Sequence, residues 1–68
     1  MISVPFKDKN EIIPLIENRI IGKNAERNRK ILYRRLIDGI GYENLAEEFG
    51  LSVRQTKNIC YKEIQRLL

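Results

Sequence analysis

The sequence contains no histidine and a single cysteine, Cys60. One thiol cannot form a disulfide within the chain, and without histidine or further cysteines the usual zinc sites cannot be assembled. We therefore expect no metal, no other cofactor and a reducing, cytoplasmic compartment. No apolar run approaches the roughly 20 residues that a membrane-spanning helix needs, and the segment 1–10 lacks the apolar stretch of a signal peptide. No membrane partner is expected.

The composition is that of a small, basic globular domain. The 68 residues, 43% hydrophobic and 32% charged, are enough for one domain, 1–68, with a modest core. Thirteen lysines and arginines stand against nine acids, which gives a net charge of +4 and a sequence pI near 9.5. This balance is typical of a nucleic-acid binder, although a mildly basic surface also serves solubility alone.

Four glycines divide the sequence into segments in which apolar residues recur at helical spacing, and no segment alternates as a strand does. Asp8 and Glu11 have the form of a capping box. Pro14 would break a helix that began there, so we expect the first helix to start near Pro14 and to stop at Gly22. The residues before it, 1–7, are expected to form an extended arm. The apolar residues of this first helix are Leu15, Ile16, Ile20 and Ile21.

Polar capping residues and glycines give the remaining boundaries. We expect Asn24 to cap a second helix through 38, a short third helix over 42–49, and Ser52 to cap a fourth helix that ends near residue 67. The core residues expected from the second helix are Ile31, Leu32 and Leu36. The predicted fold is all-α, with four helices and no winged element. Its parts are an arm and first helix (1–22), a bracing helix (24–38) and a helix-turn-helix (42–67).

The segment 42–60 contains the residues that a helix-turn-helix needs. In this motif two helices meet at about 90–120° through a turn of three or four residues. Ala46 permits close approach where the helices cross, and Gly50 can adopt the positive φ that costs other residues roughly 1–2 kcal/mol. The apolar residues expected between the two helices are Leu45, Phe49 and Leu51. The same Ala-x3-Gly spacing also occurs in ordinary helical hairpins.

The last helix has two different faces. A helical wheel places five small or apolar residues on the inner face, with Glu63 beside them: Val53, Thr56, Cys60, Ile64 and Leu67. The opposite face contains no acid and consists of Arg54, Gln55, Asn58, Tyr61, Lys62, Gln65 and Arg66, with Lys57 at its margin. The first residues of the second helix of a helix-turn-helix reach the bases, and Arg, Gln and Asn suit base edges. We therefore assign base reading to Arg54, Gln55 and Asn58, although any amphipathic helix shows a polar face to solvent.

The run from Leu36 to Val53, followed by Lys57, resembles the fourth conserved region of bacterial sigma factors. It is also similar to the DNA-binding domains of LuxR-type response regulators. The most specific part is the pattern Asp-Gly-apolar-x-Tyr-x-x-apolar-Ala over 38–46, followed by Gly-Leu-Ser-Val over 50–53. The resemblance extends over about 27–67.

The resemblance implies a module that binds the −35 promoter element through a helix-turn-helix. It implies that Ser52 and Lys57 touch the DNA backbone, and we add Tyr61 and Lys62 to this set. It further implies a structural ion pair for Arg35 and a contact with the β-subunit flap of RNA polymerase.

The sequence departs from the sigma pattern in two respects. Thr56 and Cys60 replace the usual aliphatic residues on the inner face of the recognition helix. Nothing in 1–22 corresponds to the sigma region that melts the −10 element and binds the polymerase core. We therefore expect a stand-alone bacterial or mobile-element regulator, or a fragment, rather than a complete sigma factor.

Several other residues have both a functional and a structural interpretation. Five cations within nine residues either follow DNA phosphates or form a solvated helix face: Arg27, Arg29, Lys30, Arg34 and Arg35. We expect Cys60 to be buried rather than redox-active. Glu47 and Glu48 lie on a short helix without a pocket, so no enzyme is expected. The first helix either covers the core or joins a homodimer interface made of Ile20, Ile21 and Leu68.

The sequence thus predicts sequence-specific binding of double-stranded DNA, in transcriptional control or in the regulation of a mobile element. The alternative is a protein-interaction module that docks on RNA polymerase or associates with itself.

Overall fold

Four helices make up the part of the chain that the structure, a computed structural model, describes, residues 8–68. The expected arm over 1–7 lies outside the described residues. The helices are α1 (Lys9–Arg19), α2 (Ala25–Leu32), α3 (Tyr42–Phe49) and α4 (Val53–Leu67), and a π-helical turn, η1 (Tyr33–Ile37), continues α2. No strand occurs within 8–68, so the prediction of an all-α, four-helix fold is confirmed.

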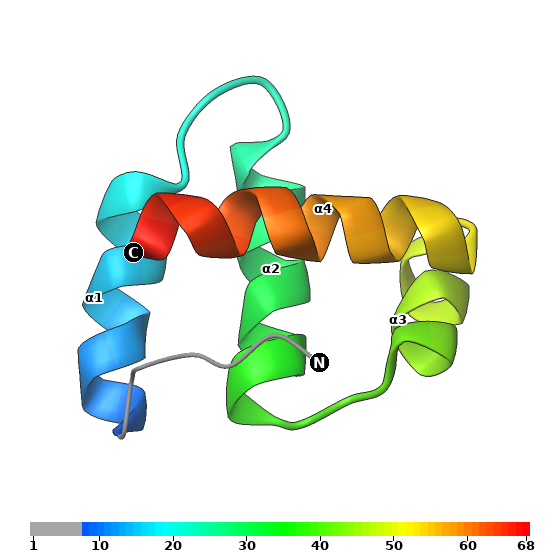
Figure 1. Cartoon of the computed structure of the whole chain (residues 1–68), viewed down its shortest axis with the longest axis horizontal. Coiled ribbons are helices and arrows are strands. Elements are labelled where there is room, and N and C mark those ends of the chain that lie inside the picture. Colours follow the sequence, from blue (N-terminus) through cyan, green and yellow to red (C-terminus); the bar gives the residue numbers. More distant parts are fainter. Residues whose placement is uncertain (1–7) are drawn as a thin grey trace.

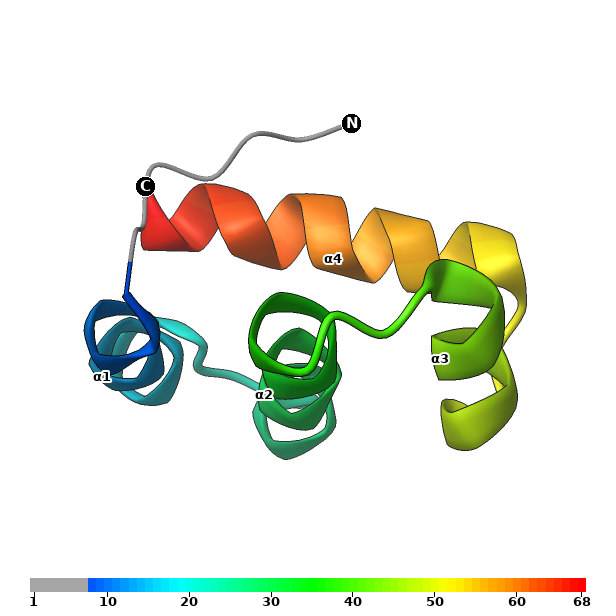
Figure 2. The same ribbon diagram turned by 90° about the horizontal axis from the view of Figure 1, so that it is seen from below.

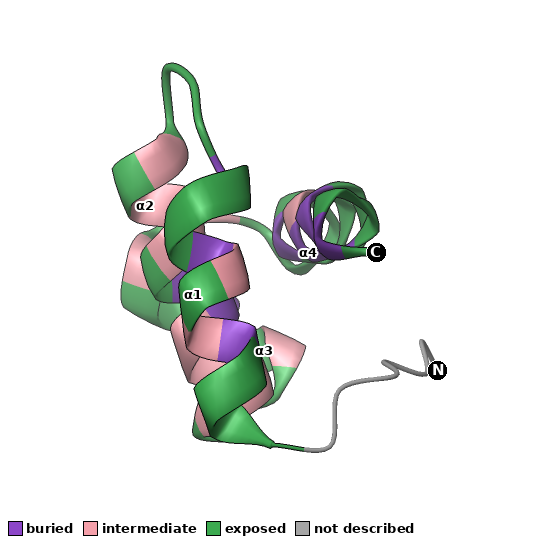
Figure 3. Cartoon of the chain, turned by 90° about the vertical axis from the view of Figure 1, so that its left-hand side faces the viewer, coloured by how far each residue is buried: buried purple, intermediate pink, exposed green. Residues whose placement is uncertain are grey.

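The fourth helix lies across the other three. Figures 1 and 2 show α1, α2 and α3 side by side, with α4 running along one side of all of them. The largest fully buried side chains come from all four helices and from the end of α1: Ile16, Ile20, Ile31, Leu32, Leu45, Thr56 and Cys60. Figure 3 shows the buried positions of α4 on the side that faces the other helices. This burial along its length anchors α4 and leaves its opposite side free.

The first helix begins five residues earlier than expected. The carboxylate of Asp8 accepts a hydrogen bond from the backbone N–H of Asn10 at 3.0 Å, which makes Asp8 the N-cap. The predicted start near Pro14 is therefore wrong, and Pro14 lies inside α1. Proline cannot donate to the carbonyl four residues earlier, which weakens one turn. Ile12 and Ile16 are both buried on one side of this turn, and we attribute the continuity of α1 to their packing.

The end of α1 also differs from the prediction. The helix stops at Arg19, and Ile20 is its C-cap rather than a helical residue. Ile20 is fully buried, whereas Ile21 is 65% exposed. Gly22 follows with a φ of 113°, a value that the absence of a side chain permits. The segment that we expected to be one apolar helix face thus turns away from the core at Ile21.

The bracing helix spans nearly the expected range but changes its geometry halfway. Asn24 occupies the N-cap position without a side-chain cap hydrogen bond. In η1 the N–H of Asp38 donates to the carbonyl of Tyr33 at 3.3 Å, five residues back, as a π-helix requires. Ile31 and Leu32 are buried as predicted, whereas Leu36 is only half-buried. The wider turn changes which side chains face α3.

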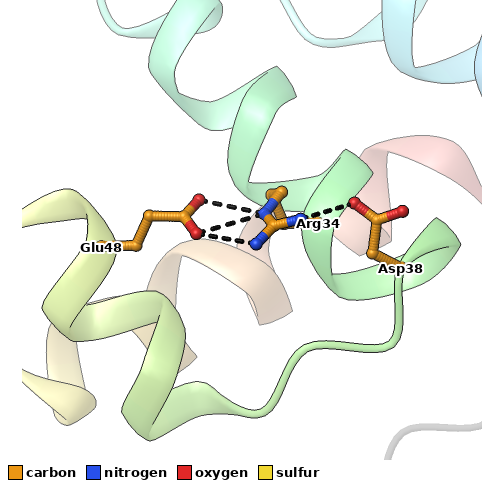
Figure 4. A network of polar contacts seen from close by, with 3 residues as sticks. All are labelled: Arg34, Asp38 and Glu48. Carbon is orange, nitrogen blue, oxygen red and sulfur yellow. Dashed lines mark hydrogen bonds and ion pairs between the residues drawn. The ribbon is translucent and has the colours of Figure 1, made fainter.

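An ion-pair network joins this turn to α3. The guanidinium of Arg34 donates to Glu48, with Nη2 and Oε1 2.9 Å apart, and to Asp38, with Nη1 and Oδ2 also 2.9 Å apart (Figure 4). The side chains of Arg34 and Glu48 are each 40% exposed, so water screens this pair and it stabilises the fold only little. The resemblance implied an ion pair for Arg35, which is wrong: no ion pair of Arg35 occurs within 8–68, and its neighbour makes the pair. We infer that the network orients α3 more than it stabilises the fold.

The two helices of the motif have the expected bounds and a three-residue connection. Gly50 caps α3 in the left-handed region, with φ 67° and ψ 34°. The N–H of Leu51 donates back to the carbonyl of Ala46 at 2.8 Å and closes the end of α3. Ser52 then caps α4. The left-handed residue and the cap therefore determine how α4 leaves α3.

We expect Gly50→Ala to destabilise the protein by about 1 kcal/mol, because alanine is strained at this φ. Gly50→Asn is the control: it also adds a side chain where a Cβ meets nothing within 4 Å, but asparagine tolerates the left-handed region. The asparagine variant should lose clearly less stability than the alanine variant. Urea unfolding of both variants gives the two free energies, and equal values would contradict the assignment of strain to Gly50.

Candidate nucleic-acid interface

The outer face of α4 is open to solvent. Ser52 and the six proposed contact residues of α4 are all exposed: Arg54, Gln55, Lys57, Asn58, Tyr61 and Lys62. The only carboxylate of α4, that of Glu63, is 3% exposed and lies on the buried side. The exposed side chains of α4 therefore include four cations, Arg54, Lys57, Lys62 and Arg66, and no acid. Such a surface attracts a polyanion and presents hydrogen-bond donors to it.

The inner face of α4 accommodates the residues in which the sequence departs from the sigma pattern. Thr56 and Cys60 are both fully buried. The hydroxyl of Thr56 donates to the carbonyl of Ser52 at 2.9 Å, so its polar group is satisfied. Ile64 and Leu67 are buried as predicted, but Val53 is 37% exposed because it begins the helix beyond the core.

A capping box holds the start of α4. The N–H of Gln55 donates to Oγ of Ser52 at 3.0 Å, and Oε1 of Gln55 accepts from the N–H of Ser52 at 3.0 Å. The side-chain oxygen of Gln55 is thus occupied, which leaves its NH₂ group for a base edge. The hydroxyl hydrogen of Ser52 remains available to a phosphate. The Ser-x-x-Gln spacing is a known signature of this cap, so the sequence contained a signal that our assignment of Gln55 missed.

An aromatic and cationic cluster supports the middle of the outer face. The guanidinium carbon of Arg35 lies 4.3 Å from the ring centroid of Tyr42, and Nζ of Lys57 lies 5.7 Å from it. The rings of Tyr42 and Tyr61 meet edge to face with centroids 6.2 Å apart. Burial raises the pKa of Tyr42, and the positive charge of the adjacent Arg35 offsets this in part. Tyr42 therefore holds two of the proposed backbone contacts, Lys57 and Tyr61, against the start of α3.

Only the fold brings Arg35 and Tyr42 together beside α4, because the sequence contains no signal that they stack. Nη1 of Arg35 donates to the carbonyl of Ile40 at 3.1 Å, which orients its guanidinium plane. Beside the cluster lies an open hollow of about 360 Å³ at the start of α3, lined by Gly41, Tyr42, Glu43, Asn44, Val53 and Lys57. Glu43 places a negative charge at its rim, so a phosphate is favoured at Lys57 rather than at the opposite side.

The five cations between residues 27 and 35 do not form one surface. Arg34 is held by Glu48 and Asp38, and Arg35 stacks on Tyr42. Nε of Arg29 is buried without a hydrogen-bond partner among the described residues. Arg27 and Lys30 line a second hollow, at the other end of α3. The interpretation of this stretch as one continuous phosphate track is therefore not supported.

Cys60 is a buried thiol between the core and the aromatic cluster. Its pKa rises to about 11 because burial penalises the thiolate, and Arg35 offsets this only in part. A thiol with such a pKa is protonated at neutral pH and a poor nucleophile.

Within residues 8–68, no three His, Cys, Asp or Glu side chains gather where they could hold a metal ion. None of the helices in that range has the length and apolar character needed to cross a membrane.

The thiol makes stability depend on alkaline pH. The pKa of Cys60 is higher in the folded state than the ordinary value of 9.0. Its contribution is therefore fully present below about pH 9 and is lost as the pH rises towards about 11. We expect the free energy of unfolding to fall by about 2 kcal/mol over this range. Cys60→Ala should flatten that slope in urea titrations, whereas Tyr33, whose pKa does not depend on Cys60, contributes equally to both proteins. An unchanged slope would assign the pH dependence to other groups.

No known family model, curated protein or solved structure matches the chain. The functional assignment therefore rests on the residues of α4, on the cluster around Tyr42 and on the motif resemblance of the sequence.

Proposed function

We propose that this protein binds double-stranded DNA in a sequence-specific manner, with α4 in the major groove, and regulates transcription. One observation supports this most directly: the exposed side of α4 carries four cations and three amide side chains, whereas its single carboxylate is buried. An amphipathic helix selected only for solubility has no need to exclude acids from its outer face. A helix that lies against phosphates has this need.

The dimensions of α4 suit the major groove. Its 15 residues correspond to about 22 Å of helix, and the groove, about 12 Å wide, admits an α-helix. Because the inner face is buried against three helices, α4 presents its outer face as a rigid unit. In this arrangement Arg54 and Asn58 are free to contact base edges, and Gln55 contributes its NH₂ group while its oxygen caps the helix.

The backbone contacts would flank these base contacts. Lys57 and Tyr61 are positioned by Tyr42, which limits the number of conformations that their side chains lose on binding. Ser52 lies at the start of α4 and Lys62 further along its exposed side. Contacts of this kind set the register of a protein on the duplex but carry no sequence information.

The regulatory role is supported by the resemblance to sigma region 4 and LuxR-type domains. On this basis the target is a bacterial promoter element or operator, and RNA polymerase is a candidate partner.

The alternative function, a module that docks on polymerase or on itself, has one specific observation in its favour. Ile21 and Leu68 are 65% and 64% exposed. Nη1 of Arg66, near the end of α4, donates to the carbonyl of Ile21 at 3.1 Å, so the end of α4 lies beside Ile21. Ile20, the third residue of the expected dimer interface, is buried and cannot take part.

The affinity for random duplex DNA should fall steeply with salt. Each neutralised phosphate releases counterions, and the slope of log K against log salt is about −0.9 per phosphate contact. Fluorescence anisotropy on a labelled random duplex from low to physiological salt measures this slope. A protein-docking module should show little affinity at any salt, and that result would overturn the proposal in favour of the alternative.

Two substitutions on α4 should have different effects. Arg54→Ala is expected to cost about 1–3 kcal/mol on the best site selected from a random duplex library, and to relax preference at one position. Lys57→Ala should weaken binding to all sequences alike and reduce the salt slope by about one unit.

Lys9→Ala, which removes an exposed cation from α1, is the matched control for these two variants and should leave both properties unchanged. The comparison requires anisotropy on the selected site and on a scrambled duplex. If the Arg54 and Lys57 variants behave like the Lys9 variant, the assigned contacts are wrong.

A further inference from the structure

We propose that the hollow between the start of α2 and the end of α3 is a docking site for an acidic, partly apolar segment of a partner protein. This inference goes beyond DNA binding and does not depend on it. The hollow has a volume of about 400 Å³ and is lined by Lys23, Asn24, Glu26, Arg27, Lys30 and Phe49. Three of these side chains are cations and one is an acid.

The positive charge of the hollow is largely uncompensated. Lys30 and Glu26 approach to 3.7 Å, but their side chains are 64% and 87% exposed, so the pair is weak and easily exchanged. Nε of Arg27 donates to the amide oxygen of Asn28 at 3.1 Å, a neutral partner that leaves the guanidinium charge intact. Lys23 makes no ion pair within residues 8–68. Carboxylates of a partner would meet two cations in excess.

The hollow also offers an apolar contact. Phe49, the last residue of α3, is half-buried and contributes to its lining. Aromatic side chains are enriched in the cores of protein interfaces, and charged residues surround them at the rim. Phe49 within a group of cations reproduces this arrangement on a small scale. The complementary segment has an apolar or aromatic side chain flanked by aspartates or glutamates.

The open shape favours a chain segment over a small ligand. Small-molecule sites bury most of the surface of their ligand within a concave pocket. The hollow here lies on the surface, and its cations are mostly exposed. A peptide that lies across it would use both the charges and the ring without being enclosed.

The same hollow is poorly placed for the DNA that α4 would bind. Tyr42 begins α3 on the side of the proposed DNA surface, and Phe49 ends it about 10 Å further along the axis. Figure 2 shows the start of α3 beside α4 and its end farther from α4. A duplex on the outer face of α4 would therefore leave the hollow accessible, so both partners can bind at once.

The test is an NMR titration of the full ¹⁵N-labelled chain, without DNA, using a short peptide of alternating glutamate and leucine. A second peptide with glutamine at every glutamate position is the charge-free probe. The acidic peptide should shift the amide signals of residues 23–30 and of Phe49, and the glutamine peptide should not. Binding of both peptides alike, or shifts confined to the outer face of α4, would overturn the proposal.

Charge reversals locate the site. Arg27→Glu should weaken binding of the acidic peptide by about tenfold. Lys62→Glu makes the same charge change on α4 and should have little effect on the affinity for this peptide. Equal weakening by both variants would mean that the peptide senses only net charge, which contradicts a defined site. In duplex DNA binding the order should reverse, so that Lys62→Glu weakens binding more than Arg27→Glu.

These measurements also separate the two proposals. If DNA binding is lost in neither variant while the peptide result holds, the proposed function fails and the docking site stands. If a random duplex shifts the hollow signals in place of the α4 signals, the hollow binds phosphates and the docking site is wrong.

Discussion

The arrangement depends on one packing relation, the burial of the inner face of α4 against the three other helices. Thr56 and Cys60 lie near its middle, and Ile64 and Leu67 near its end, all with almost no exposed surface. The buried residues of the other helices, among them Ile16, Ile31 and Leu45, belong to the same core. A helix held along its whole length cannot roll, so its opposite face has a fixed composition. The proposed DNA-binding surface is thus the outer side of the same helix that completes the core.

The direction of α4 is determined by the three residues that precede it. Gly50 adopts the left-handed conformation and Ser52 forms a reciprocal cap with Gln55. Arg34 meanwhile joins η1 to Glu48 on α3. The turn and the cap are each worth about 1 kcal/mol, and the ion pair is screened by solvent. Their contribution is orientation, because a small change of angle at Gly50 would move Arg54 and Asn58 out of reach of a groove.

The sequence allowed a good prediction of the C-terminal half and a poorer one of the N-terminal half, for physical reasons. Gly50 and Ser52 are local signals with local consequences, so α3 and α4 have the expected bounds. Pro14 is also a local signal, but tertiary burial of Ile12 and Ile16 outweighs it. The sequence resemblance implied an ion pair for Arg35, but Arg34 makes it. The cause is η1, because a π-helical turn changes which side chains face α3. No residue pattern in the sequence predicts such a turn. The stacking of Arg35 on Tyr42 likewise joins residues brought together only by the fold.

The positions of the charged residues, rather than their number, determine which surfaces of the protein are basic. Glu63 is buried on the inner side of α4, Glu48 and Asp38 are used by Arg34, and Glu26 faces a lysine across a turn of α2. The acids are thereby kept off the outer face of α4, which a net charge of +4 alone would not ensure. Two groups of the remaining cations lie at opposite ends of α3, one on α4 beside Tyr42 and one around Phe49. Two separate basic surfaces on so small a domain are what a protein needs if it is to hold a nucleic acid on one side and an acidic partner on the other.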